Sequence, residues 1–187
     1  MLQLEGSNTA AGLRFAVVVA KFNDFVTDRL QSGALEALAA AGVSSNDISV
    51  IKVPGAFEVP FAARQAAEQG RYAAVICLGC LIKGATPHFE YIASAASHGI
   101  ADAASSTGVP MTFGVLTTNS VEEALERAGA GATNKGWEAA MAAVEMATLQ
   151  KKIRDTAPDG NEAAERNRAT GPHERSGRVG RETPAGK

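Results

Sequence analysis

Apolar residues along this chain gather in short runs that alternate with longer segments of helical spacing. Four runs are almost wholly apolar or β-branched, which is typical of strands buried on both faces of a parallel sheet. We predict strands at residues 15–20, 48–53, 73–78 and 111–117. The pattern therefore indicates four short strands distributed along one chain.

Between and after these strands, apolar residues recur with a helical period. We predict helices at residues 25–41, 57–69, 89–107, 121–127 and 135–152. Glycine, a common helix stop, follows three of these segments, at positions 42, 70 and 108. The sequence from Ser120 to Glu123 has the pattern of a capping box, which predicts the start of the fourth helix.

Strands that alternate with helices over short links predict a parallel sheet with helices on both faces. The expected fold class is therefore α/β, with a four-stranded parallel sheet between two helical layers. In such sheets, ligands bind beyond the carboxyl ends of the strands. The loops after the first three strands are therefore the places where we expect a functional site.

The composition divides the chain into three parts. From residue 154 onward the chain is polar, rich in Arg, Glu, Gly and Pro, and nearly free of apolar residues. Such a segment buries too little surface to offset the entropy of ordering. We predict one domain over residues 13–152, a loose N-terminal arm over residues 1–12 and a disordered tail over residues 153–187.

Charge and composition limit the classes of function. The 187 residues are 45% hydrophobic and 20% charged, and the net charge of -2 argues against a nucleic-acid partner. No apolar run approaches the ~20 residues of a membrane span, and the first residues lack the pattern of a signal peptide. Two cysteines do not make a disulfide framework. We expect a cytoplasmic protein without membrane or nucleic-acid partners.

The segment from Gly79 to Tyr91 holds the most distinctive chemistry. Gly84 and Thr86 could expose backbone N–H groups and a hydroxyl to an anion, and the helix expected next adds partial positive charge. His88 stands at that helix start, and an imidazole can move a proton near neutral pH. The segment predicts chemistry on a small phosphorylated molecule, although a surface helix cap remains an equal interpretation of His88.

Two other loops at the same predicted edge hold unusual side chains. Phe22, in a polar turn with Asn23, could stack on a flat ring or simply pack in the core, and both interpretations stay open. Glu58 ends the segment Gly55-Ala56-Phe57-Glu58. From sequence alone, a solvated carboxylate at a helix start is the favoured interpretation of Glu58.

Two cations flank a glycine-rich turn near the end of the expected domain. Arg127 suits the C-terminus of one helix, whereas Lys135 at the start of the next opposes the helix dipole, which favours a functional role. Cys77 and Cys80 have redox-motif spacing, but residues three apart on a strand face opposite sides, so structural cysteines are favoured. His98 and His173 are isolated, and we expect no metal site.

Taken together, these residues resemble the lumazine synthases of riboflavin biosynthesis over about Phe15 to Lys151. The matching segments are Phe22-Asn23-Asp24, Val53-Pro54-Gly55-Ala56-Phe57-Glu58-Val59-Pro60, Gly84-Ala85-Thr86-Pro87-His88-Phe89-Glu90-Tyr91, Phe113-Gly114-Val115-Leu116-Thr117-Thr118, Glu126-Arg127-Ala128-Gly129 and Asn134-Lys135-Gly136. Each segment alone is weak, but their order along the chain makes the resemblance specific. It implies a flavodoxin-like three-layer sandwich.

The resemblance implies a transferase that works without a cofactor. It would condense 5-amino-6-(D-ribitylamino)uracil with 3,4-dihydroxy-2-butanone 4-phosphate to 6,7-dimethyl-8-ribityllumazine, releasing phosphate and water. It assigns binding of the ribitylaminouracil to Phe22, Asn23, Ala56, Phe57, Glu58, Cys80, Leu81, Ile82, Phe113 and Lys135. It assigns phosphate binding to Ala85, Thr86 and Arg127, and proton transfer to His88.

Phe113 does not fit a site within one chain, because it lies near the start of the fourth strand rather than at its carboxyl end. The family resolves this by placing the site between subunits, with Phe113, Arg127 and Lys135 supplied by a neighbour. The resemblance therefore implies a homo-oligomer, a pentamer that some members assemble into a sixty-subunit shell. The short loop after Arg127 favours the shell, and association with riboflavin synthase is also implied.

Three positions depart from the family pattern and thin out positive charge near the expected phosphate site. Lys83 stands where arginine is usual, Gly131 replaces a frequent lysine, and Thr133 replaces a frequent glycine. Two alternative functions remain, a flavin-binding module without catalysis and a shell-forming protein without activity. The presence of both His88 and Arg127 favours the enzyme over these alternatives.

Overall fold

The computed structural model describes residues 1–156, and within them four strands form one parallel sheet in the order β2-β1-β3-β4. The strands are β1 (Phe15–Ala20), β2 (Ile48–Val53), β3 (Ala74–Ile82) and β4 (Met111–Thr118). Every strand pair is parallel. The predicted α/β fold class is confirmed.

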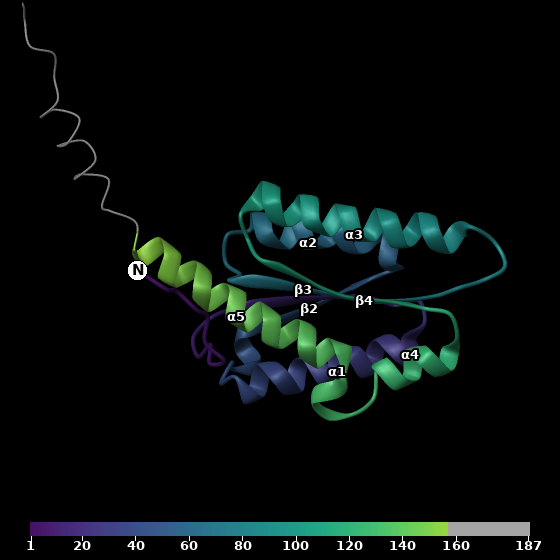
Figure 1. The fold of residues 1–187 in the computed structure, drawn as a ribbon, viewed down its shortest axis with the longest axis horizontal. Coiled ribbons are helices and arrows are strands. Elements are labelled where there is room, and N and C mark those ends of the chain that lie inside the picture. Colours follow the sequence, from purple (N-terminus) through teal and green to yellow (C-terminus); the bar gives the residue numbers. More distant parts are fainter. Residues whose placement is uncertain (157–187) are drawn as a thin grey trace, which may run out of the picture. The chain divides into compact units, whose positions relative to one another are not determined.

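Helices cover both faces of this sheet (Figure 1). They are α1 (Asp24–Ala40), α2 (Val59–Glu68), α3 (His88–Thr107), α4 (Val121–Arg127) and α5 (Lys135–Asp155), with short 3-10 turns η1 (Ser45–Asp47), η2 (Ala56–Glu58) and η3 (Gly131–Thr133). Helices α2 and α3 lie on one face, and α1, α4 and α5 lie on the other. The result is the predicted three-layer arrangement.

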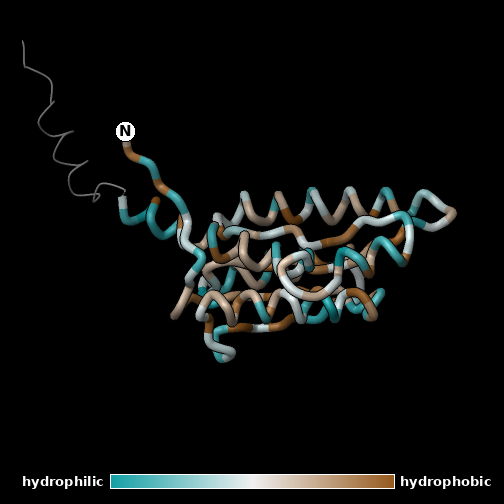
Figure 2. Tube along the Cα trace, turned by 60° about the horizontal axis from the view of Figure 1, so that its bottom comes forward, coloured by the Kyte–Doolittle hydropathy of each residue, from teal (hydrophilic) through white to brown (hydrophobic). Residues whose placement is uncertain are grey.

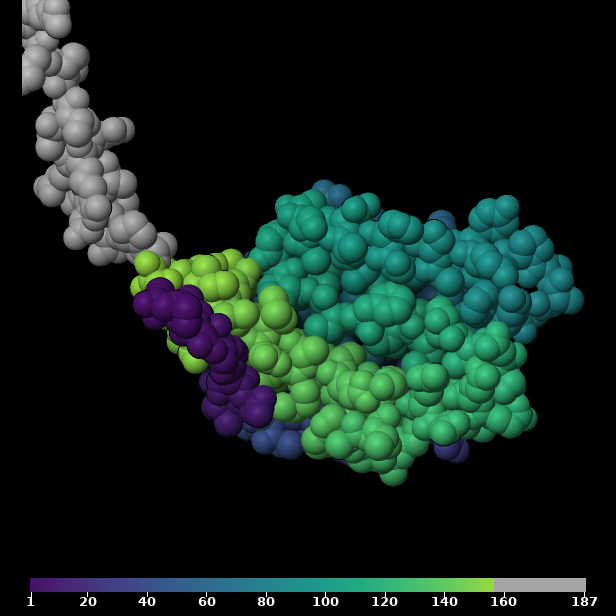
Figure 3. Space-filling view, viewed as in Figure 1, coloured from purple at the N-terminus to yellow at the C-terminus, as the bar shows by residue number. Residues whose placement is uncertain are grey.

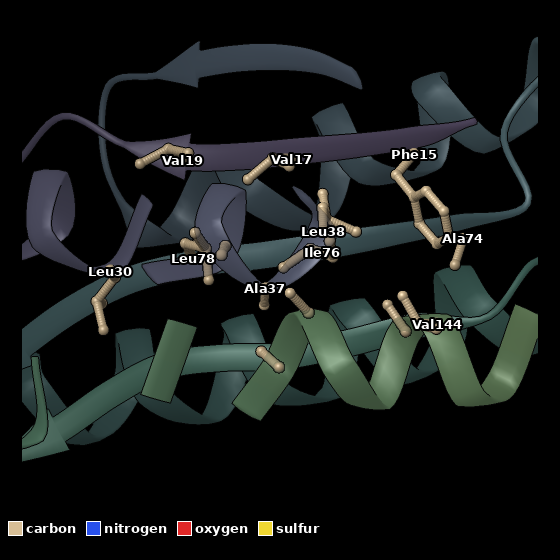
Figure 4. Packing of buried hydrophobic residues seen from close by; sticks show 14 of the residues in the cluster. Phe15, Val17, Val19, Leu30, Ala37, Leu38, Ala74, Ile76, Leu78 and Val144 are labelled. Atoms are coloured by element: carbon tan, nitrogen blue, oxygen red, sulfur yellow. The ribbon is translucent and has the colours of Figure 1, made fainter. Parts of the chain in front are cut away.

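The central strand β1 explains why its sequence is apolar throughout. All six of its residues are at most 1% exposed, because both faces are covered. Phe15, Val17 and Val19 point toward α1 and α5 (Figure 4), whereas Ala16 and Val18 belong to the core under α2. Along the outer helices, hydrophilic and hydrophobic segments alternate (Figure 2), as expected for helices with one buried side.

Strand β3 is longer than predicted. The sequence places its end at Leu78, before a glycine, but the strand continues to Ile82. The reason is pairing, because β4 continues alongside and Cys80 and Ile82 lie opposite Leu116 and Thr118. The extension carries residues 80–82 to the carboxyl edge of the sheet.

The two cysteines on β3 face opposite sides of the sheet, as predicted. Cys77 packs in the core beneath α2, and Cys80 belongs to the core on the α1 side. Both are free thiols. Burial raises the pKa of Cys77 to about 12 and that of Cys80 to about 11. A structural role fits both residues.

The first turns of α2 and α4 refine the predicted helix starts. The segment predicted as a helix from residue 57 begins as the 3-10 turn η2 and becomes α-helical at Val59. At α4, the Ser120 hydroxyl accepts from the Glu123 amide at 3.2 Å, as a capping box requires. In a full capping box the Glu123 carboxylate would accept from the amide of Ser120. Here it accepts instead from the amide of Asn119, the residue before Ser120, at 2.8 Å.

The N-terminal arm lies along α5, as the purple segment across the yellow-green helix in Figure 3 shows. The Ser7 amide donates to the hydroxyl oxygen of Thr148 at 2.7 Å, and the Lys152 ammonium donates to the Glu5 carbonyl at 2.9 Å. Helix α5 continues to Asp155, three residues past its predicted end. Residues 153–155, predicted as the start of the disordered tail 153–187, belong to this helix, and the part of that tail from residue 157, with His173, lies outside the described residues.

Candidate active site

A hollow of about 570 Å³ opens beyond the carboxyl ends of β1, β2 and β3. We call it the His88 hollow. It is lined by Phe22, Asn23, residues 54–58, residues 80–82, Gly84, Thr86, His88, Phe89 and Ile92. The three loops singled out in the sequence therefore converge on one place, as the position of the strand ends requires.

Aromatic side chains border the His88 hollow without entering the core. Phe22 is 68% exposed and Phe57 is 58% exposed. The core interpretation of Phe22 is therefore wrong, and its ring is available to stack on a flat ligand. Glu58 lines the same hollow from the end of η2 and is exposed.

Asn23 holds the loop after β1 in place. Its backbone is left-handed, with φ 61 and ψ 48, a conformation that asparagine tolerates better than most residues. Its side-chain amide donates to the Cys80 carbonyl at 3.0 Å, which ties the loop to the end of β3. The turn that carries Phe22 is thereby tied to the edge of the sheet.

The loop between β3 and α3 is exposed and carries the candidate phosphate and proton-transfer residues. Gly84, Thr86 and His88 line the His88 hollow, and His88 is the first residue of α3. Ala85 is exposed but is not among the lining residues. The Lys83 ammonium lies 3.5 Å from the Glu90 carboxylate, so an exposed ion pair partly balances its charge.

A second hollow, of about 600 Å³, lies between the edge strand β4 and α5. We call it the Arg127 hollow. It is lined by residues 112–117, Arg127, Lys135, Glu138, Ala139 and Ala142. Phe113, which is 48% exposed, therefore lies with both candidate cations.

The two hollows have no lining residue in common. As predicted from its place on the strand, Phe113 does not join the loops around His88. Arg127 and Thr86, both assigned to the phosphate by the resemblance, line different hollows. One chain therefore places the residues that the resemblance assigns to one site in two separate hollows.

Glu138, a carboxylate that the sequence analysis did not single out, lines the Arg127 hollow and pairs with Lys135. The Lys135 ammonium donates to both oxygens of Glu138 at 2.7 Å. The sequence could have predicted this ion pair, because residues three apart on a helix, such as Lys135 and Glu138, are neighbours. Within residues 1–156, Arg127 forms no ion pair, so it is the cation of this hollow whose charge is not balanced by a direct partner.

Among residues 1–156, no three His, Cys, Asp or Glu side chains are grouped to hold a metal ion. Each helix in that range is too short or too polar to cross a membrane.

The parallel sheet covered on both faces, with a hollow beyond its strand ends, defines a flavodoxin-like α/β protein built to bind small molecules. The model of the 6,7-dimethyl-8-ribityllumazine synthase family matches residues 12–151, and the chain belongs to this family.

Curated relatives carry the same family name over almost their whole length. The 6,7-dimethyl-8-ribityllumazine synthase of Syntrophus aciditrophicus (strain SB) is 54% identical over 149 residues, which cover 80% of this chain and 97% of the relative. That of Desulfatibacillum aliphaticivorans is 50% identical over 151 residues, which cover 81% of this chain and 97% of the relative.

Proposed function

We propose that this chain condenses 5-amino-6-(D-ribitylamino)uracil with 3,4-dihydroxy-2-butanone 4-phosphate in a site shared by two subunits. The product is 6,7-dimethyl-8-ribityllumazine, a late intermediate of riboflavin biosynthesis, and phosphate and water leave. Family membership over residues 12–151 supports the reaction. The observation that supports the shared site is the division of the motif residues between two hollows on one chain.

The His88 hollow supplies the ring-binding and proton-moving part of this site. The exposed rings of Phe22 and Phe57 offer surfaces on which the pyrimidine stacks, and residues 80–82 line the same hollow. Imine formation and loss of phosphate each require proton transfer, and His88 is placed at the same opening. A positioned general acid or base contributes roughly 10²–10⁴-fold to rate.

The Arg127 hollow supplies the cationic part. A guanidinium without an ion-pair partner is free to donate two parallel hydrogen bonds to a phosphate group. Phe113 adds a second aromatic surface beside it. Joining the Arg127 hollow of one subunit to the His88 hollow of the next brings Arg127 to the phosphate that Thr86 and Ala85 hold on the other side.

Repetition of this contact around a ring closes into a homo-oligomer, and we propose a pentamer. The short loop between Arg127 and Lys135 extends the proposal to a sixty-subunit shell. A cytoplasmic location fits the two free buried thiols. Association with riboflavin synthase is a further proposal that rests on the resemblance.

A complementation experiment tests the shared site. His88→Ala and Arg127→Ala proteins are each expected to be nearly inactive. If they are co-expressed in equal amounts, about a quarter of random interfaces combine an intact His88 hollow with an intact Arg127 hollow. Turnover should therefore recover to about that fraction of wild type.

The readout is lumazine absorbance together with released phosphate, against the uncatalysed reaction. A co-assembled sample as inactive as either single variant would place both residues in a site within one subunit. A wild-type assembly without acceleration of either signal would contradict the reaction itself and favour the flavin-binding or shell-forming alternative.

A further inference from the structure

Asn134 lies between the two cations of the Arg127 hollow, immediately before Lys135 and seven residues after Arg127. It is 2% exposed and does not line that hollow. A polar side chain this buried normally has all its hydrogen-bonding groups occupied. The hydrogen-bond partners of its side chain therefore show which segments Asn134 connects.

The Asn134 side chain bonds to three separate parts of the chain. Its amide nitrogen donates to the Gly129 carbonyl at 2.7 Å and to the Arg29 carbonyl of α1 at 3.1 Å. Its oxygen accepts from the amides of Gly136 and Trp137 at 2.8 and 3.3 Å. The oxygen thus caps α5, while the nitrogen ties the preceding loop to α1.

The surrounding backbone is packed closely enough to fix this side chain. A Cβ atom added at Gly33 would lie 2.5 Å from the Asn134 side-chain carbon, and one added at Gly136 would lie 1.9 Å from the Leu30 carbonyl oxygen. Both glycines therefore let α1 and the start of α5 meet around Asn134. The side chain has no room to turn to other partners.

Ala128, which is 2% exposed, packs the start of the loop of residues 128–134 into the core, but few hydrogen bonds tie the rest of the loop to other elements. The described backbone hydrogen bonds of this loop are short-range turns, such as Gly129 to Glu126 and Asn134 to Gly131. A groove of about 250 Å³ separates residues 128–131 from α1. The nitrogen of Asn134 is therefore the loop's hydrogen-bonded link to α1 within the described structure.

We infer that Asn134 is a positioning residue that fixes the end of α4, and with it the Arg127 guanidinium, for recognition of the phosphate group. Gly129, which Asn134 holds, lies two residues after Arg127. This inference rests on the proposed function, because it takes the Arg127 hollow as the phosphate side of the site. Misplacing a binding group by about 1 Å can cost about 10²-fold in rate.

Asn134 has two roles, a cap of α5 through its oxygen and a link to the loop and α1 through its nitrogen. An ordinary helix cap needs only an acceptor, so a variant that keeps the oxygen and loses the nitrogen separates them. Asn134→Asp keeps the acceptor for Gly136 and Trp137 but loses both donors. Asn134→Ser also keeps a capping oxygen and adds no buried charge. Thr148→Val, which removes a partly buried hydroxyl from the far part of α5, is the matched control.

The test compares the Michaelis constants for the two substrates and inhibition by inorganic phosphate. For either Asn134 variant we expect the KM of the phosphorylated substrate and the inhibition constant of phosphate to rise by about tenfold or more. The KM of the ribitylaminouracil should change less than about twofold, because the cap of α5 remains. Thr148→Val should move neither constant.

Three results would overturn the inference. They are an unchanged phosphate inhibition constant in both folded variants, an equal rise in both KM values, and failure of both variants to fold. If wild-type protein turns over neither substrate, the proposed reaction fails, and calorimetric binding of inorganic phosphate then decides the role of Asn134. Absence of phosphate binding by wild-type protein would overturn both.

Discussion

At the scale of single residues, the pairing of Lys135 with Glu138 sets how much positive charge the Arg127 hollow offers. The resemblance to the family leads us to expect a lysine at position 131, where this chain has glycine. With Lys135 engaged by a carboxylate on its own helix, Arg127 supplies most of the attraction for an anion. Affinity for phosphate should therefore be limited by Glu138.

Glu138→Gln tests this limit. Loss of the carboxylate frees the Lys135 ammonium, and exposed ion pairs of this kind are worth about 0.3–1 kcal/mol, or roughly twofold to fivefold in affinity. We expect the KM of the phosphorylated substrate and the inhibition constant of phosphate to fall by that factor. Glu68→Gln, which breaks the exposed pair with Arg64 on α2, is the control. Tighter phosphate binding in the control, or weaker binding in Glu138→Gln, would contradict the argument.

Sequence reasoning found most lining residues of the His88 hollow but not how the site is divided. Phe22, Phe57 and His88 follow strand ends, and topology brings strand ends together. Glu138 and Asn134 were not singled out as site residues, because each acts on a neighbour. Glu138 pairs with Lys135, and Asn134 bonds to the loop that follows Arg127. Their helical spacing and capping position were the available signals.

At the scale of elements, strand and helix positions were largely predictable and strand ends were not. Strands β1 and β2 begin and end where the apolar pattern predicts. Strand β3 passes through Gly79 because β4 pairs with it to the last residue. A strand ends where its pairing with a neighbour ends, so the residues of one strand alone do not specify its end.

The same strand makes the fold sensitive to alkaline pH. Unfolded thiols lose their protons near pH 9, whereas Cys77 and Cys80 in the folded chain have pKa values of about 12 and about 11. Above pH 9 the unfolded state therefore binds fewer protons than the folded state, and the free energy of unfolding falls as pH rises. The slope approaches about 1.4 kcal/mol per pH unit for each thiol.

Urea unfolding between pH 8 and pH 11 measures this slope. We expect the Cys77→Ala/Cys80→Ala protein to be less stable at pH 8, because the cavities it creates lose contacts. Its stability should nevertheless decline less steeply toward pH 11 than that of wild type. Parallel declines would show that the thiols do not couple to unfolding.

At the scale of the whole molecule, large aromatic side chains stand exposed on the α2 and α3 layer. Phe61 is 73% exposed and Tyr91 is 72% exposed, in addition to Phe57 in the His88 hollow. Exposed aromatic residues of this size are typical of surfaces that bind another protein. A second copy of the chain is the occupant that the proposed shared site predicts.

Phe61→Glu should separate the subunits, because burying a carboxylate in such a contact is costly. We expect monomers by light scattering, an unchanged circular dichroism spectrum and turnover reduced by about tenfold or more, although His88 and Arg127 are intact. Phe61→Tyr retains the ring and should retain the assembly. Full turnover by monomeric Phe61→Glu would show that one subunit suffices.

The N-terminal arm determines where anything attached to the first residue would be located. Lys152 holds Glu5 at one end of α5, and Lys135 lines the Arg127 hollow at the other. The 17 helical steps between the two lysines span about 25 Å. A dye, affinity tag or carrier protein joined to Met1 would therefore be carried away from the ligand-binding edge, which makes Met1 the suitable point for immobilising this enzyme on a surface.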